Sequence, residues 1–157
     1  MRAKYIFTII IALLVVIIGQ SFFGQFKIAK AVLNLPSIAL VIFCFFGKDD
    51  LNNLIAAVFL AFFLELTSPY YGFYLGVFLI LWLILKYVIR AISEKNVLSF
   101  VFIALGSGVI YQSLFLLFSI FFKSIPGYFN WQSLIYNFIA SIVMYYIYGF
   151  FKKQIQG

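Results

Sequence analysis

A single carboxylate, Glu65, lies inside the apolar stretch FFLELTSPYYGFYLG, which runs from Phe62 to Gly76. An ionisable group in such surroundings is costly, so it usually binds a proton or an ion, or pairs with a polar group. No second acid and no Lys or Arg is available deep in the apolar stretches to build a relay with it. We therefore predict that Glu65 pairs with a polar group on another helix or on a partner protein. A tolerated charge at the membrane interface is the alternative.

Polar side chains in the other apolar stretches are the candidate partners of Glu65. Amides and hydroxyls can both donate a hydrogen bond to a carboxylate. Three amides and three hydroxyls are available, namely Gln20, Gln112, Asn137, Ser113, Ser119 and Ser141. Each could equally make an ordinary interhelical hydrogen bond, worth about 0.6 kcal/mol on average.

The residue types that most enzymes need are scarce in this chain. It has no histidine and one cysteine, Cys44, which lies between two phenylalanines in an apolar stretch. This composition excludes Ser-His and Cys-His nucleophile pairs, removes most metal chemistry, and excludes a disulfide within the chain. We therefore expect a protein that is not an enzyme and holds no cofactor, with Cys44 as a small buried apolar side chain.

The composition as a whole indicates an integral membrane protein. Of the 157 residues, 66% are hydrophobic and 10% are charged, whereas a soluble domain has about half and about a quarter. Several apolar stretches exceed the roughly 18 residues that mark a spanning helix, and helices satisfy their own backbone groups in lipid. The prediction is an all-α, single-domain bundle over residues 1–157. Its first apolar stretch, from Tyr5 to about Gly19, is expected to be retained as a signal anchor.

Turn residues divide the chain into six predicted spans. They cover residues 5–23, 35–46, 51–68, 72–89, 97–122 and 131–151. The second span is short, about 18 Å at 1.5 Å per residue. The segment before it, GQFKIAKAVLNLP, is amphipathic and is expected to lie at the membrane interface. Alternatively, the span begins near Ile28 and is kinked at Pro36.

The distribution of Lys and Arg predicts the orientation of the bundle. With the N-terminus inside, eight basic residues lie inside and three outside. The inside residues are Arg2, Lys4, Lys48, Lys86, Arg90, Lys95, Lys152 and Lys153, and the outside residues are Lys27, Lys30 and Lys123. Both termini are therefore predicted to be cytoplasmic. No basic cluster is dense enough to neutralise several phosphates of a nucleic acid.

The turn after Glu65 is predicted to form a tight helical hairpin. Pro69 disfavours helical geometry at Ser68 and lacks an amide proton, so the third helix is expected to stop there. Gly72 is a small residue that can restart the chain close against the third helix, and Gly76 continues the same face. The pairs Gly72-x-x-x-Gly76 and Ala57-x-x-x-Ala61 are both suited to close helix packing within the bundle.

Tyrosines near the ends of the predicted spans are expected to anchor the protein at the two membrane interfaces. Tyr70, Tyr71 and Tyr74 are assigned to the outer belt together with Tyr128, Phe129 and Trp131. Tyr145, Tyr146 and Tyr148, near Lys152 and Lys153, are assigned to the inner belt. Most of the aromatic content is thus expected to face lipid headgroups.

Two stretches together resemble the MreD family of rod shape-determining membrane proteins. They are LPSIALVIFCFFG and, after a short charged loop, LAFFLELTSPYYGFYLGVFLILWLILKY. The family has a proline in its second span, then an acidic residue near the end of the third, a Ser/Pro turn, and a glycine that opens the fourth. Those positions are occupied here by Pro36, Glu65, Ser68, Pro69 and Gly72. The family more often carries Asp, after a Gly, where this chain has Glu65 after Phe-Phe-Leu.

The last span, WQSLIYNFIASIVMYYIYGFFKK, is also similar to the family's last span, and Asn137 stands where the family tends to carry a polar residue. The resemblance implies a non-enzymatic subunit of the machinery that elongates the lateral cell wall, in the cytoplasmic membrane of a bacterium. It implies an MreC-like scaffold protein as partner, and through it a RodA-type glycosyltransferase, a class B penicillin-binding protein and MreB filaments.

A second candidate function is the substrate-binding S component of an energy-coupling-factor vitamin transporter, which has a similar size and number of helices. Such a component needs an Ala-x-x-x-Ala face on its first helix, whereas the first span here, IFTIIIALLVVII, contains Ala12 alone. It also needs several polar groups that converge in the outer half of the membrane, and few are available. The scaffold function is therefore preferred.

Overall fold

The computed structural model describes residues 2–20, 34–68, 72–92, 95–121 and 130–156, with side chains described from residue 5 to residue 150 of these ranges. The described residues form helices and no strands, so the predicted all-α class is confirmed for them. The six helices are α1 (Arg2–Ile18), α2 (Leu35–Phe46), α3 (Asp50–Leu66), α4 (Phe73–Ala91), α5 (Val97–Phe121) and α6 (Trp131–Gln156).

Three of these helices are long and apolar enough to cross a membrane. The segments are Phe73–Ala91, Val97–Phe121 and Trp131–Phe150, in α4, α5 and α6. The apolar parts of α1 and α2, Tyr5–Ile18 and Leu35–Phe46, are shorter. Each predicted span overlaps a helix. Helix α6 runs to Gln156, five residues beyond the predicted end. Helix α1 covers Arg2–Ile18, whereas the predicted range is 5–23, and residues 21–23 lie outside the described residues. The amphipathic segment before α2 falls almost entirely outside the described residues, as does Ile28.

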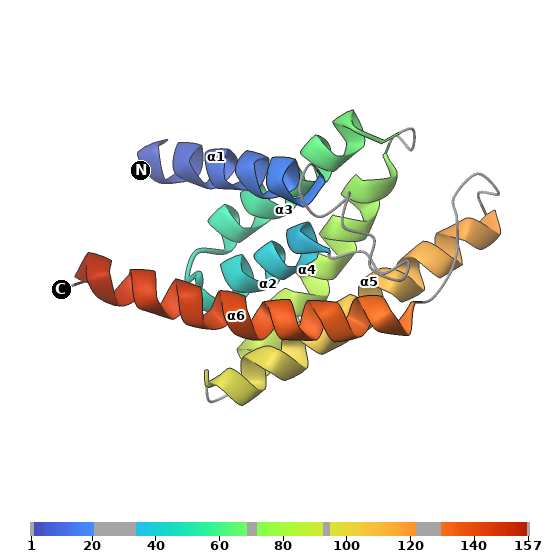
Figure 1. Cartoon of the computed structure of the whole chain (residues 1–157). Coiled ribbons are helices and arrows are strands. Elements are labelled where there is room, and N and C mark those ends of the chain that lie inside the picture. The colour runs from blue at the N-terminus through green and yellow to red at the C-terminus, as the bar shows by residue number, and fades with distance from the viewer. Residues whose placement is uncertain (1, 21–33, 69–71, 93–94, 122–129, 157) are drawn as a thin grey trace.

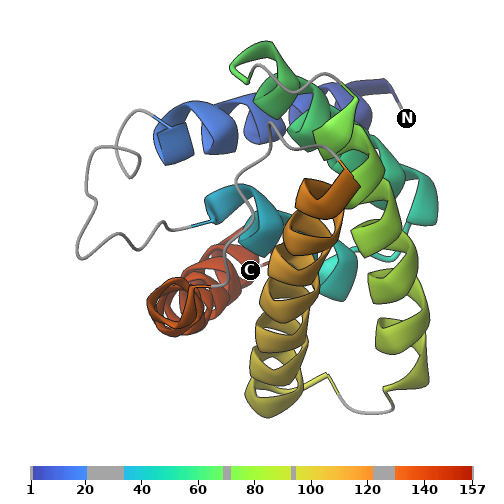
Figure 2. The ribbon, with the colours of Figure 1, turned by 90° about the vertical axis from the view of Figure 1, so that its right-hand side faces the viewer.

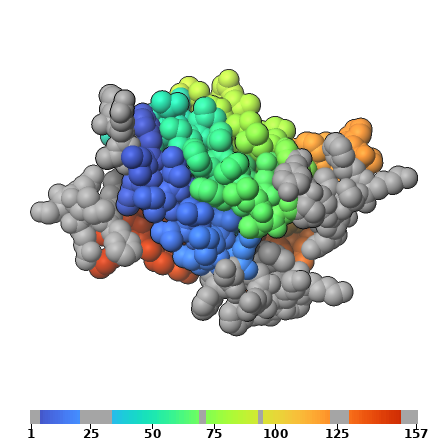
Figure 3. Space-filling model, turned by 90° about the horizontal axis from the view of Figure 1, so that it is seen from above, coloured from blue at the N-terminus to red at the C-terminus, as the bar shows by residue number. Residues whose placement is uncertain are grey.

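The helices run alternately up and down the bundle. Figure 1 shows the starts of α1, α3 and α5 at the same end of the molecule as the ends of α2, α4 and α6. Figure 3 shows α1 and α3 side by side on one face of the molecule. The two helices are linked in the interior by a hydrogen bond of 2.8 Å from Thr8 Oγ1 to Asn52 Oδ1. Helices that succeed one another in the chain are therefore antiparallel neighbours.

The short helix α2 is the centre of the bundle. It contacts all five other helices, and Figure 2 shows it between α1, α3, α5 and α6. Ten of its twelve residues are buried, and Leu40, Val41 and Phe45 are fully enclosed. A helix that is apolar on every side is buried on every side. In contrast, α1, α5 and α6 leave long rows of apolar side chains exposed, for example Ile135 at 59% and Phe102 at 66%.

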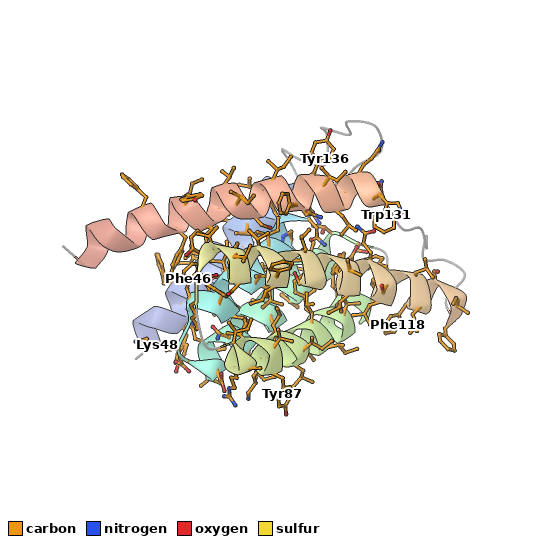
Figure 4. All side chains as sticks on the ribbon, turned by 90° about the horizontal axis from the view of Figure 1, so that it is seen from below. Phe46, Lys48, Tyr87, Phe118, Trp131 and Tyr136 are labelled. Atoms are coloured by element: carbon orange, nitrogen blue, oxygen red, sulfur yellow. The ribbon has the colours of Figure 1, made fainter. Side chains whose placement is uncertain are left out.

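An aromatic cluster fixes α2 to α5 and α6 (Figure 4). The ring of Phe46 stacks on Tyr148 with 4.4 Å between centroids, and Phe45 meets Phe100 edge to face at 5.2 Å. Tyr145 lies 5.1 Å from Phe100. Tyr145 and Tyr148 are thus partly buried against the core, while Tyr146 is exposed, and the inner membrane belt stays a prediction. An aromatic residue near a helix end suits an interface and a core equally well.

Candidate functional site

The carboxylate of Glu65 caps the helix that follows its own. Glu65 is half-buried near the end of α3, and its Oε1 accepts a hydrogen bond of 2.8 Å from the backbone N–H of Leu75. Leu75 is the third residue of α4, one of the positions whose N–H has no partner within the helix. The N-cap residue, Gly72, has no side chain to satisfy it. Glu65 supplies that cap from α3, and its negative charge suits the positive end of the α4 dipole.

The end of α3 is closed by a second group of hydrogen bonds. The backbone N–H of Thr67 donates to Leu64 O at 3.2 Å, and that of Ser68 donates to Glu65 O at 3.2 Å. The Thr67 hydroxyl donates to the same Leu64 carbonyl at 2.9 Å and accepts a hydrogen bond from the side chain of Gln20, at the end of α1. Helix α3 therefore ends at Leu66 through a local turn. Pro69 lies outside the described residues.

Gly72 and Gly76 have different roles from those predicted. Gly72 has a φ of 77°, the left-handed region that glycine adopts without strain. A Cβ atom at Gly72 or at Gly76 would meet no atom within 4 Å. The prediction that the two glycines bring α4 close to α3 is therefore wrong: Gly72 is required by its backbone conformation. Ala57 and Ala61, in contrast, are fully buried in the core.

Neutral polar groups close the N-terminal end of α2. Asn34 is its N-cap: the Asn34 Oδ1 accepts from Ser37 N at 3.2 Å, and the Ser37 hydroxyl donates to Asn34 O at 3.0 Å. Asn137, which is 7% exposed, accepts a hydrogen bond from Asn34 N at 2.9 Å through its Oδ1. Pro36 lies in the first turn, where a missing N–H costs nothing. Asn137 thus ties α6 to the start of α2.

The other predicted partners of Glu65 make different contacts. Gln112 exchanges two hydrogen bonds with the backbone of Asn130, at 2.9 and 3.3 Å, and so joins α5 to the start of α6. Ser119 and Ser141 donate to carbonyl groups of their own helices. The donor that Glu65 meets is a backbone amide, which no side-chain pattern could identify. The available sequence signal was an acid one turn before a helix break, followed by a glycine N-cap.

A polar pocket of about 560 Å³ opens at the C-terminal end of α2. Twelve residues line it and define what we call the basic pocket: Cys44, Gly47, Lys48, Asp49, Asp50, Asn53, Trp82, Lys86, Ile89, Arg90, Ile92 and Lys95. They come from the α2–α3 connection, from the first turn of α3, from the last turns of α4 and from the residues before α5. In the sequence, the four basic residues indicate only the orientation of the bundle, and no pattern predicts that they meet.

Hydrogen bonds and ion pairs order the walls of the basic pocket. Asp50 Oδ2 pairs with Lys86 Nζ at 3.2 Å and also with Arg90. Asp49 Oδ1 caps α3 and accepts from Leu51 N at 3.0 Å. Lys95 Nζ donates to the carbonyl of Phe45 at 2.7 Å, at the negative end of α2. Hydrogen bonds and ion pairs thus connect several of the charged side chains that line the pocket.

Within the described residues, no group of three or more His, Cys, Asp or Glu side chains could hold a metal ion. The arrangement can instead fix helix ends, through Glu65 and Asn137, and attract anions at the basic pocket. None of the family models, curated proteins or solved structures compared with the chain matches it.

Proposed function

We propose that the protein is a membrane scaffold of the MreD type, a non-enzymatic subunit that holds an MreC-like protein and, through it, peptidoglycan synthases. The observation that carries the proposal is the cap of Leu75 by Glu65, at 2.8 Å. Glu65 and Gly72, two of the residues that carry the family resemblance, are used together, because Glu65 supplies the cap that Gly72 has no side chain to provide, and this joins α3 to α4. Two helices joined in this way offer a preorganised surface to a partner.

The packing of the bundle favours a scaffold over a vitamin-binding subunit. Large side chains fill the centre, with Phe45, Phe78 and Phe100 fully buried. Ala12, the small residue of α1 that a coupling subunit would need to contact, is also fully buried. The carboxylate of Glu65 already has a structural hydrogen bond inside the bundle. These features support a protein whose helices serve association.

The proposed location is the cytoplasmic membrane of a bacterium, with six spans and both termini in the cytoplasm. Lys48, Lys86, Arg90 and Lys95 surround one pocket. The start of α1 and the end of α6 lie at that same end of the bundle (Figure 1). Concentration of Lys and Arg at one end is typical of the cytoplasmic side.

The function is tested in a rod-shaped bacterium depleted of its own MreD protein. The unaltered chain is expected to restore rod shape and to copurify with the MreC protein in mild detergent. Glu65→Leu is expected to insert into the membrane but neither to restore rod shape nor to copurify with MreC, because α4 loses its cap. Glu65→Gln keeps a hydrogen-bonding carbonyl and is expected to weaken both only modestly. Ser119→Ala, which removes a bond within its own helix, is the matched control.

Two results would contradict parts of the proposal, the first the role of Glu65 and the second the scaffold function. Full activity of Glu65→Leu would show that Glu65 is a tolerated interfacial charge. Copurification with a transporter ATPase and one tightly bound vitamin per chain would establish the S-component function instead.

The orientation is tested separately with single cysteines at Ser93, Ser124 and Gln156 in a Cys44→Ser background. An impermeant thiol reagent added to intact cells is expected to label only the cysteine at position 124. Labelling at position 93, or none at position 124, would overturn the proposed orientation.

A further inference from the structure

We infer that the basic pocket binds a phosphate ester that also carries a hydroxyl group. This is the chemistry of a phosphatidylglycerol headgroup in a bilayer and of a soluble polyol phosphate. The inference is independent of the proposed role in cell-wall elongation, because it rests only on the residues that line the pocket.

The charge of the pocket favours an anion. Four of its lining residues are cationic and two are carboxylates. One carboxylate, Asp49, is already used to cap α3. Cations in excess at a concave site concentrate the field there and attract an anionic group. The start of α3, which lies in the same wall, adds the positive end of a helix dipole.

The geometry of two cations shows where an anionic oxygen is held. Lys86 and Arg90, one helical turn apart on α4, both reach a single oxygen atom, Oδ2 of Asp50. Two donors that converge on one oxygen form the arrangement that binds a phosphate or carboxylate oxygen through charge-assisted hydrogen bonds. Asp50 therefore marks the position of an anionic oxygen, and its carboxylate competes with a bound anion for Lys86 and Arg90. Its side chain is 44% exposed, so a ligand can reach the same donors.

Asn53 identifies the second part of the ligand. Asn53 is 5% exposed and lines the pocket, and its Oδ1 is the one buried side-chain atom of the described residues without a hydrogen-bond partner. Such an atom costs roughly 1–3 kcal/mol unless a donor reaches it. An ionised phosphodiester has acceptors only, so a donor to this atom has to come from water or from another group of the ligand. A hydroxyl on the esterified alcohol supplies it.

The remaining lining is apolar and gives a built-in reporter. Ile89 and Ile92 contribute aliphatic surface, and the ring of Trp82 lies 5.2 Å from Lys86 Nζ. The chain has one other tryptophan, Trp131, which is 71% exposed at the start of α6, near the opposite end of the bundle (Figure 4). A Trp131→Phe variant therefore has tryptophan fluorescence from the pocket alone.

Binding is measured by titrating this variant in a neutral detergent while the fluorescence of Trp82 is recorded, with native mass spectrometry for stoichiometry. Short-chain phosphatidylglycerol is expected to give a saturable change with one lipid per chain. Short-chain phosphatidylcholine, which is zwitterionic and lacks the hydroxyls, is expected to give none. Phosphatidylmethanol has the same charge as phosphatidylglycerol but no hydroxyl, and we expect it to bind about fivefold more weakly because Asn53 stays unpaired.

Substitutions that are expected to change the affinity in opposite directions distinguish an effect on binding from damage to the fold. Lys86→Gln and Arg90→Gln are each expected to raise the half-saturation concentration about tenfold. Asp50→Asn removes the competing carboxylate and is expected to lower it about threefold. Lys123→Gln changes the net charge by the same amount as Lys86→Gln, at a sequence position between the end of α5 and the start of α6, and is expected to have no effect.

The outcomes decide between the two sources of the ligand. Saturation by phosphatidylglycerol but not by soluble glycerol 3-phosphate assigns the pocket to a lipid headgroup, and saturation by both assigns it to phosphate esters in general. Absence of saturation with either probe would overturn the inference. Equal binding of phosphatidylcholine, or a weaker interaction in Asp50→Asn, would also overturn it. Equal binding of phosphatidylmethanol would refute the role of Asn53.

Discussion

The backbone groups that are unpaired at the two ends of α2 find their partners in different ways. A helix of twelve residues is about 18 Å long, whereas the hydrocarbon core of a membrane is about 30 Å thick. The N–H and C=O groups at its two ends, which have no partner within the helix, therefore lie inside the bundle. At the N-terminal end, Asn34, Ser37 and Asn137 satisfy one another without a charge. At the C-terminal end, Lys95 binds the Phe45 carbonyl, and a pocket of about 560 Å³ remains open.

The difference shows what each end can be used for. A closed network of neutral groups joins helices and leaves no room for a ligand. At the C-terminal end, Lys and Arg side chains extend from neighbouring parts of the chain on long flexible stems, and a cavity remains between them. Four predictions test this contrast, and they run from the largest expected effect to the smallest.

Substituting Gly47 should damage the C-terminal end of α2 most. A Cβ atom there would lie 2.3 Å from the backbone oxygen of Phe43 and 2.4 Å from Asn53 Oδ1. The backbone oxygen cannot move without disturbing the last turn of the helix. We expect Gly47→Ala to lower the free energy of unfolding by about 3 kcal/mol, measured as a fall in the thermal midpoint in detergent.

Gly76→Ala is the matched control for Gly47. A Cβ atom at Gly76 meets nothing within 4 Å, and alanine is the better helix former by about 0.5–1 kcal/mol. The midpoint should stay the same or rise. A fall as large as that of Gly47→Ala would show that glycine content, and not the end of α2, controls the stability.

Asn137→Leu tests the neutral end. It keeps the size of the side chain but leaves the partly buried N–H of Asn34 without its acceptor. The expected loss is about 2 kcal/mol, read from the same thermal unfolding experiment. Ser119→Ala, on the exposed side of α5, should lose less than about 0.5 kcal/mol. Equal effects of the two would mean that the N-terminal end of α2 does not depend on its hydrogen bonds.

Lys95→Met should have a smaller effect on the charged end. It removes the hydrogen bond to Phe45 O and the cation at the negative end of α2, but it preserves the apolar stem. We expect a loss of about 1 kcal/mol. Lys48→Met, at an exposed lysine of the same pocket, should cost close to nothing. If Lys48→Met lowered the stability as much as Lys95→Met, the hydrogen bond from Lys95 to the Phe45 carbonyl would not be what stabilises this end.

Arg90→Gln should have the smallest effect on stability. Its side chain is 60% exposed, and its ion pair with Asp50 is accessible to salt. A loss of at most about 0.5 kcal/mol is expected, and it should vanish in high salt. The same substitution is expected to weaken anion binding about tenfold. A large loss of stability would mean that the cations of the basic pocket are structural.

The position of α2 as a helix could be predicted from the sequence, but its place in the bundle could not. Asn34, Pro36 and Gly47 are start and stop signals, and the predicted range of 35–46 coincides with the helix. The helix is apolar on every side, so its sequence contains no periodicity to show which face is buried. Only its contacts with all five other helices reveal that it is central.

The sites were predictable only where one residue stood out locally. Glu65 is conspicuous because a charge interrupts an apolar stretch, yet its donor, the Leu75 amide, has no signature in the sequence. The basic pocket was not predictable. Lys48 and Lys95 lie almost fifty positions apart, and each resembles an ordinary charge at a membrane surface. Their convergence depends on the packing of α2, α3 and α4.

The shortness of α2 also has a consequence for the synthesis of the protein. A segment enters a bilayer from the insertion machinery when it has about 20 predominantly apolar residues. Helix α2 offers twelve, and α3 carries Asp50, Asn52 and Asn53 in its first turn. Neither helix has the length and apolarity of a spanning segment on its own, and both are completed by packing against α4, with α5 also covering α2. The segment at the centre of the finished bundle is thus the one that depends most on the later part of the chain.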